Sequence, residues 1–281
     1  MRMSLEEASA FLRKPAAPQK KPSPAERAAR SRLNVLSSLA AMGHLRPCEV
    51  GAACWAGSRF SLQMAQRCLR DLTESGDVKS RPNSVGSTSY VLTHVGARTL
   101  AHHGLPGKHG LNLRSVSGGT FMHHSITSRF VIEKRIQGWE AFSEHGIASG
   151  LAPISTAAIR KRFGKICDGV LVNCHSDRPD HMFFLEVESA LKSNDELMRV
   201  LSLARTVGTR IDPALPYVVG GLYIVYAEPS HAVRIQRAAR LMWSERSASE
   251  RASLSACITL VHVNIGLPLV WRDFSESTLS I

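Results

Sequence analysis

Two strand-like segments carry acidic residues whose spacing suits metal-ion chemistry. Glu186 and Glu188 alternate with apolar residues in the stretch FFLEVESALKS, so both carboxylates project from one face of a strand. Asp168 lies within FGKICDGVLVNC, where a charge among apolar neighbours needs a partner. If the two segments pair as antiparallel strands, Asp168 and Glu186 converge. Two oxygen ligands from neighbouring strands are what Mg²⁺ takes when water and a phosphate fill its remaining positions.

The segments around these acids predict an α/β domain. Hydrophobic periodicity predicts helices over 122–142, 192–208 and 230–245, and strands over 163–174, 182–189, 216–227 and 255–265. The first two strands are expected to form an antiparallel hairpin. Ser193 or Asn194 is expected to cap the helix that follows them. Helix, hairpin, helix, strand, helix and strand together indicate a mixed sheet flanked by helices.

Positive charge is concentrated in the other half of the chain. Residues 1–110 hold 16 Lys and Arg against 7 Asp and Glu, a net charge of +9, whereas the remaining 171 residues hold 19 against 16, a net charge of +3. A solubilising basic surface explains the total of +12 but not this asymmetry. The charge therefore indicates a polyanion partner for the N-terminal half, most simply nucleic acid.

The basic half is predicted to contain helices and a hairpin. The pattern favours helices over 32–43, 48–56, 58–76 and 94–104, with two short strands within 78–93. In helix 58–76 the expected apolar stripe consists of Leu62, Ala65, Cys68, Leu69 and Leu72. The opposite face carries Gln and Arg, whose side chains match adenine and guanine edges or grip phosphates. The candidate DNA-binding residues are Arg59, Ser61, Gln63, Gln66, Arg67, Arg70, Lys79 and Arg81.

Three helices followed by a basic hairpin resemble a winged helix-turn-helix over residues 30–104. The resemblance implies that helix 58–76 is the recognition helix and that 78–93 is the wing. Such a module can also serve protein contacts, and that alternative stays open.

The acidic segments resemble the motif of the restriction-endonuclease-like, or PD-(D/E)XK, nuclease fold. That family places an Asp on one strand and a (D/E)-X-K tripeptide on the next, with a helix following. Asp168 and Glu186 match the two acidic positions, which makes them the candidate metal ligands. Glu188 stands where the family has a Lys that orients or activates the attacking water. The resemblance implies that Lys192 or Lys165 would supply this cation, so all five residues are candidate catalytic groups.

Together, the winged helix, the paired histidines 123 and 124, CDGVLV and FFLEVE resemble the replication-relaxation family over about residues 30–230. These proteins are associated with plasmids and other mobile elements. The resemblance implies a double-stranded DNA-binding accessory or initiator protein for the mobilisation or replication of such an element. The N-terminal residues lack the long apolar core of a secretory signal, so we expect a cytoplasmic protein; the resemblance implies a bacterial one associated with the nucleoid or a plasmid.

Three interpretations of the acids stay open. They form a solvated strand face, with Asp168 paired to Lys165 or Arg162; they belong to a degenerate nuclease fold kept for structure or DNA contact; or they form an active DNA endonuclease. The degenerate fold is favoured over the active enzyme because Glu188 has the wrong sign for its position. Mg²⁺ is expected as a cofactor only if the site is active. A further alternative is a winged-helix transcriptional regulator whose C-terminal domain senses a ligand or dimerises.

The chain length of 281 residues accommodates more than one domain. We expect a basic flexible arm over 1–29, a winged-helix domain over 30–104, a Gly-rich linker over 105–121 and a nuclease-like α/β domain over 122–281. The six cysteines lack CxxC spacing and predict neither a disulfide framework nor a zinc site. No apolar run approaches a membrane-spanning length. The expected partners are double-stranded DNA, other DNA-processing proteins and further copies of the chain.

Overall fold

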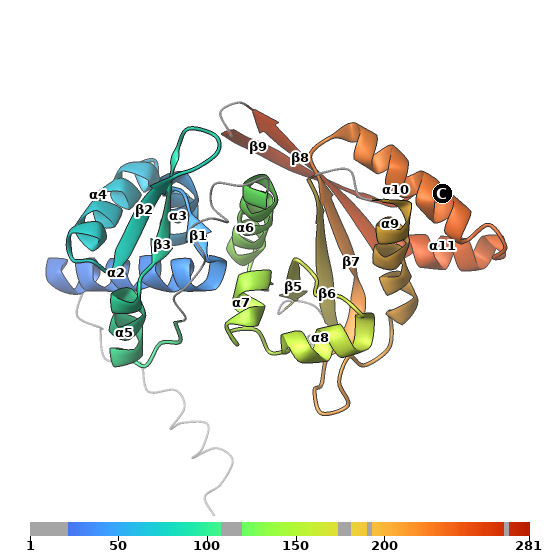
Figure 1. The fold of residues 1–281 in the computed structure, drawn as a ribbon, viewed down its shortest axis with the longest axis horizontal. Coiled ribbons are helices and arrows are strands. Elements are labelled where there is room, and N and C mark those ends of the chain that lie inside the picture. The colour runs from blue at the N-terminus through green and yellow to red at the C-terminus, as the bar shows by residue number, and fades with distance from the viewer. Residues whose placement is uncertain (1–21, 108–119, 174–180, 190–192, 267–269) are drawn as a thin grey trace, which may run out of the picture.

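The structure is a computed structural model that describes residues 22–107, 120–173, 181–189, 193–266 and 270–281. It is a mixed α/β protein with two sheets (Figure 1). The coarse expectation of helices around a mixed sheet is confirmed.

The N-terminal half combines helices with a small antiparallel sheet of strand order β1-β3-β2. Its helices are α2 (Pro24–Met42), α3 (Pro47–Cys54), α4 (Ser61–Glu74) and α5 (His94–His102). Its strands are β1 (His44–Leu45), β2 (Val78–Pro82) and β3 (Thr88–Leu92). These are the helices and the hairpin that the sequence predicts, with the two-residue β1 added.

Helix α2 begins inside the stretch predicted as a flexible arm. Ser23 and Glu26 form a capping box, in which each side chain accepts a hydrogen bond from the other residue's backbone N–H. These bonds satisfy donors that a helix N-terminus leaves open, so the helix starts at Pro24 and not near Arg32. It ends where expected, at Gly43, which has a φ of 83°. Residues 1–21 of the predicted arm lie outside the described residues.

The C-terminal half is built on a mixed sheet of strand order β4-β5-β6-β7-β8-β9. Its strands are β4 (Glu140–Ser143), β5 (Gly169–Val172), β6 (His181–Glu188), β7 (Val218–Tyr226), β8 (Ile258–Gly266) and β9 (Val270–Thr278). Strands β6, β7 and β8 run parallel to one another, and each other neighbouring pair is antiparallel. Its helices are α6 (Thr120–Ile136), α7 (Glu144–Ala148), α8 (Thr156–Phe163), α9 (Asn194–Ser202), the 3₁₀ helix η2 (Leu203–Thr206), α10 (Pro229–Met242) and α11 (Ala248–Ala256).

The two faces of this sheet are covered by different elements (Figure 1). On one face, Leu185 and Val187 of β6 belong to a core that includes α6 and extends to α2 and α4 of the N-terminal half. On the other face, Phe184 belongs to a second core, with α8, α9 and α10. Alternation along β6 therefore directs Glu186 toward this second face.

Helix α2 contacts α7 at the junction between the halves. The Ser143 hydroxyl donates a hydrogen bond of 2.7 Å to the carbonyl oxygen of Ala41 and also accepts one from the backbone N–H of Gly146. A Cβ added to Gly146 would lie 3.0 Å from that Ala41 oxygen, so glycine allows the close approach. The predicted division at 105–121 stays a prediction, and residues 108–119 of it lie outside the described residues.

Several short elements were not predicted from the sequence. Strand β4 occupies the end of the helix predicted over 122–142, and α7, α8, α11 and β9 lie in segments for which no helix or strand was predicted or, for α11, at the edge of a predicted strand. Strand β5 is shorter than expected, because α8 ends at Phe163 and the ladder begins only at Gly169. Asp168 therefore precedes the strand and does not lie in its middle. Within the described residues, no helix is long and apolar enough to cross a membrane.

Candidate functional site

Asp168 is held at the end of the β5–β6 pairing. The register pairs Gly169 with Leu185, and the backbone N–H of Asp168 donates to the Leu185 carbonyl at 3.0 Å. The predicted antiparallel hairpin is therefore confirmed. One carboxylate oxygen of Asp168 accepts a 2.7 Å hydrogen bond from the backbone N–H of Val187, just beyond the last ladder pair. The side chain thus continues the ladder after the β5 backbone has ended, which is a structural role.

The second carboxylate oxygen of Asp168 faces helix α6. It lies 3.1 Å from Nε2 of His123, whose Nδ1 is 3.4 Å from the Ser189 hydroxyl. His123 therefore links the first helix of this half to the ends of β5 and β6. The other two residues considered as partners of Asp168 make contacts elsewhere: Lys165 contacts Glu186, and Arg162 donates to the Thr209 hydroxyl.

Glu186 is the carboxylate that Lys165 contacts. Its side chain has no exposed surface, and its Oε2 lies 2.5 Å from the Lys165 amino group, which is 28% exposed. Glu188 is also buried, at 2% exposure, so the expectation of a solvated strand face is wrong. Burial of a carboxylate costs free energy unless an opposite charge or hydrogen bonds compensate it. Lys165, one of the two cations proposed from the sequence, provides that compensation for Glu186.

Asp168 and Glu186 both lie close enough to the buried Cys167 thiol to change its pKa. Burial raises the pKa of this thiol well above its usual value, and the negative charges of Glu186 and Asp168 raise it further. Burial also raises the pKa of Glu144, which begins α7, and Asp168 adds to that effect. Asp168 and Glu186 are thus near each other, but the contacts described above connect them to different elements: α6 and the loop before β5.

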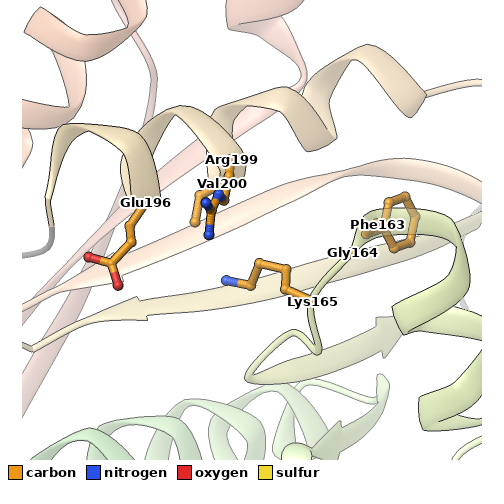
Figure 2. Close-up of a pocket in the computed structure, with 6 residues that line it drawn as sticks. All are labelled: Phe163, Gly164, Lys165, Glu196, Arg199 and Val200. Atoms are coloured by element: carbon orange, nitrogen blue, oxygen red, sulfur yellow. The ribbon is translucent and has the colours of Figure 1, made fainter.

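A cavity of about 430 Å³ adjoins the Lys165–Glu186 pair. It is lined by Phe163, Gly164, Lys165, Glu196, Arg199 and Val200. Figure 2 shows the Lys165 amino end directed into the space beneath α9, from which Glu196 and Arg199 project. Glu196 accepts hydrogen bonds from Ser193 as part of the α9 capping box, which confirms Ser193 as the predicted cap. The second proposed cation, Lys192, lies outside the described residues.

Histidines cluster where β1 and α6 meet. His44 is 1% exposed, stacks on Phe121 at 5.6 Å between ring centroids, and contacts His124 edge-on at 6.0 Å. Burial, reinforced by His124 and other nearby positive charges, lowers the pKa of His44 to about 4. Burial likewise lowers the pKa of His124. Neutral imidazoles pack here as apolar groups, and within the described residues no group of three or more His, Cys, Asp and Glu side chains could hold a metal ion.

Helix α4 presents the predicted DNA-binding face to solvent. Its opposite face is buried, with Ala65, Leu69 and Leu72 at 0% exposure and Cys68 at 8%. Gly51 of α3 positions it, because a Cβ there would lie 3.0 Å from the Ser61 backbone. The exposed residues include Arg59, Gln63, Gln66, Arg67 and Arg70, with Ser61 partly buried. The prediction that Leu62 belongs to the buried apolar stripe is wrong, because its side chain is 46% exposed.

The β2–β3 hairpin lies next to this helix and carries the other two predicted cations. Lys79 and Arg81 both lie on β2 with exposed side chains. The turn is fixed by Asn83, whose side-chain oxygen accepts hydrogen bonds from the backbone N–H groups of Val85 and Ser87. Gly86 has a φ of 74°, a left-handed conformation that glycine adopts at low cost. All eight predicted DNA-binding residues therefore fall on α4, the residues that precede it, or the hairpin.

The sequence did not predict the contacts of two residues that the fold brings to the acidic region. Arg199 is an exposed residue of α9 that lines the cavity. Its spacing from Glu196 predicts that the two share a helix face, but not that this face lies over the loop that carries Lys165. The sequence offered His123 as a metal ligand or as a hydrogen-bonded structural group, but not as the partner of Asp168, which is distant in sequence. Compared with known proteins, the chain matches no family model and no curated protein sequence.

Proposed function

We propose that this protein binds double-stranded DNA through α4 and the β2–β3 hairpin, arranged as a winged helix. The observation that carries the proposal is the division of α4 into a fully buried face and a solvent face of Gln63, Gln66, Arg67 and Arg70. Arginine grips phosphates and guanine, and glutamine pairs with adenine, so this face combines groups for both kinds of DNA contact. Exposed cations on β2 are suited to the phosphates beside the groove.

The salt dependence of duplex binding tests this placement. Replacing Arg67 and Arg70 together by Ala should lower the slope of log affinity against log salt by about 2, because each lost phosphate contact removes roughly one counterion. Arg237 and Arg240 on α10 make a matched control, since they have the same spacing and are also exposed. Their replacement should leave the slope unchanged. An equal effect of the two double variants would contradict the proposal.

In this proposal the C-terminal half is a degenerate nuclease-like domain. Three features support this: Asp168 immediately precedes β5, Glu186 and Glu188 lie on the next strand, and helix α9 follows them. Asp168 accepts a backbone hydrogen bond and Glu186 is enclosed with Lys165, so both carboxylates have structural roles. Action as an accessory or initiator factor of a mobile element rests on the resemblance to the replication-relaxation family.

A metal-dependent DNA endonuclease is the second candidate, and the Lys165–Glu186 contact favours it. A lysine beside Glu186 could replace the motif's lysine, whose position is taken by Glu188 in this chain. Incubation of supercoiled plasmid with Mg²⁺ or Mn²⁺ separates the candidates. For the degenerate domain we expect no metal-dependent nicking. Nicking by the wild type that Asp168→Asn and Glu186→Gln both abolish would establish the enzyme instead.

A further inference from the structure

Large apolar side chains are exposed around the first turn of α4. Phe60, Leu62 and Met64 are 50%, 46% and 39% exposed, although the opposite face of the same helix is completely buried. Three large exposed apolar side chains within five residues are more than the singly scattered ones that need no explanation. The guanidinium carbon of Arg59 lies 4.6 Å from the ring centroid of Phe60, so a cation accompanies the apolar group.

The angular positions of Leu62 and Met64 around the helix axis place them on either side of the two glutamines of α4. At about 100° per residue, Gln66 lies about 40° from Leu62, and Gln63 about 100° from it. Met64 lies on the far side of Gln63, again about 100° away. Leu62 and Met64 thus border the two glutamines on opposite edges of the solvent face. The helix's exposed acids, Asp71 and Glu74, lie toward its other end.

An A·T base pair offers the complementary pattern in the major groove. Adenine presents an acceptor and a donor, which the amide of glutamine can pair with together, and thymine presents its C5 methyl group to apolar side chains. A G·C pair has no methyl group. Recognition helices contact base edges with their N-terminal residues, which is where these side chains lie. The acids at the C-terminal end of α4 would be repelled by phosphates, which favours the same orientation.

We propose that the first turn of α4 reads A·T base pairs, with Gln63 and Gln66 on adenine and Leu62 and Met64 against thymine methyl groups. This inference rests on the proposed DNA binding and specifies its target. The partner is DNA and not an apolar protein surface because Arg59, Arg67 and Arg70 surround the apolar groups with positive charge. Uracil in place of thymine offers a direct test, since it pairs identically but lacks the methyl group.

The experiment begins with selection of the tightest-binding duplexes from a random pool, and the selected duplex is then made with thymine or with uracil. Wild-type protein should bind the uracil duplex about three- to fivefold more weakly for each contacted methyl group, as expected for one buried carbon. In Leu62→Ala combined with Met64→Ala this difference should disappear. The matched control, Leu241→Ala on α10, removes an apolar side chain that is 61% exposed and should keep the difference.

The outcomes separate this inference from the proposed function. Salt-dependent duplex binding with equal affinity for thymine and uracil DNA overturns the base-reading inference and leaves DNA binding intact. Unchanged DNA binding by the Leu62 and Met64 variant also overturns it and assigns the apolar groups to a protein contact. If the protein binds no duplex at all, both proposals fail.

Discussion

The amino group of Lys165 lies 2.5 Å from Oε2 of Glu186, and the acidic member of this ion pair has no exposed surface. The two residues come from different elements: the loop after α8 and strand β6. The ion pair explains how a carboxylate can face a core that contains Phe184 and Val200. It also means that Lys165 and Glu186 cannot be considered separately when the site is altered.

Removal of Lys165 alone should destabilise the protein, because the buried Glu186 would lose its compensating charge. For Lys165→Met we expect a loss of about 3 kcal/mol in the free energy of unfolding, measured with urea. The double variant with Glu186→Met should recover much of this loss, since it buries no uncompensated charge. Lys161→Met, an exposed neighbour on α8, is the control. Equal stability of Lys165→Met and Lys161→Met would show that the ion pair is unimportant.

His44 should make the protein less stable in mild acid. The unfolded chain protonates this histidine near its usual pKa of 6.5, whereas burial lowers the folded pKa to about 4. Between these values the unfolded state binds more protons, so stability is complete above the higher pKa and falls as the pH approaches the lower one. The contribution reaches about 3 kcal/mol and changes no further at still lower pH.

His44→Leu should remove this part of the pH dependence of the unfolding free energy, while the exposed control His103→Gln should keep it. The measurement is urea denaturation at a series of pH values between 4 and 7. A curve for His44→Leu that runs parallel to the wild-type curve would contradict the assignment.

The two leucines of α4 should differ sharply in their effect on stability. Leu69 is fully buried, so Leu69→Ala should cost about 3 kcal/mol through lost burial and the cavity that remains. Leu62 is 46% exposed, and Leu62→Ala should change stability by less than about 0.5 kcal/mol. Thermal unfolding of the two variants compares them directly. A large loss in Leu62→Ala would restore this residue to the core, where the sequence pattern places it.

The Ser143 hydroxyl should contribute to the junction between the two halves. Ser143→Ala removes both the α7 cap and the bond to Ala41, at a cost of about 2 kcal/mol. Ser155→Ala on α8 is the matched control, because Ser155 caps its helix in the same way but is exposed. Its cost should be about 1 kcal/mol. Equal losses of unfolding free energy would mean that the bond to Ala41 contributes nothing.

Local patterns account for the elements that the sequence predicts well. The hairpin after α4, the Ser193 cap and the antiparallel pairing of β5 with β6 depend on residues close together in the chain. The missed elements β4 and α7 span four and five residues, which is too short for periodicity to emerge. Leu62 was wrongly predicted to be buried. Helical periodicity indicates the direction in which a side chain points, but not whether a neighbouring element extends far enough to cover it.

By itself, the sequence determined that basic and amide side chains share one face of α4, and that acids alternate along β6, because both facts follow from the period of a helix and a strand. Only the tertiary structure decided which partners the acids have. Asp168 contacts His123, 45 positions away, and Glu186 contacts Lys165, 21 positions away. These pairings depend on where α6 and the loop after α8 pack against the sheet. Residues brought together by long-range packing follow no periodic pattern in the sequence, so periodicity cannot predict their contacts.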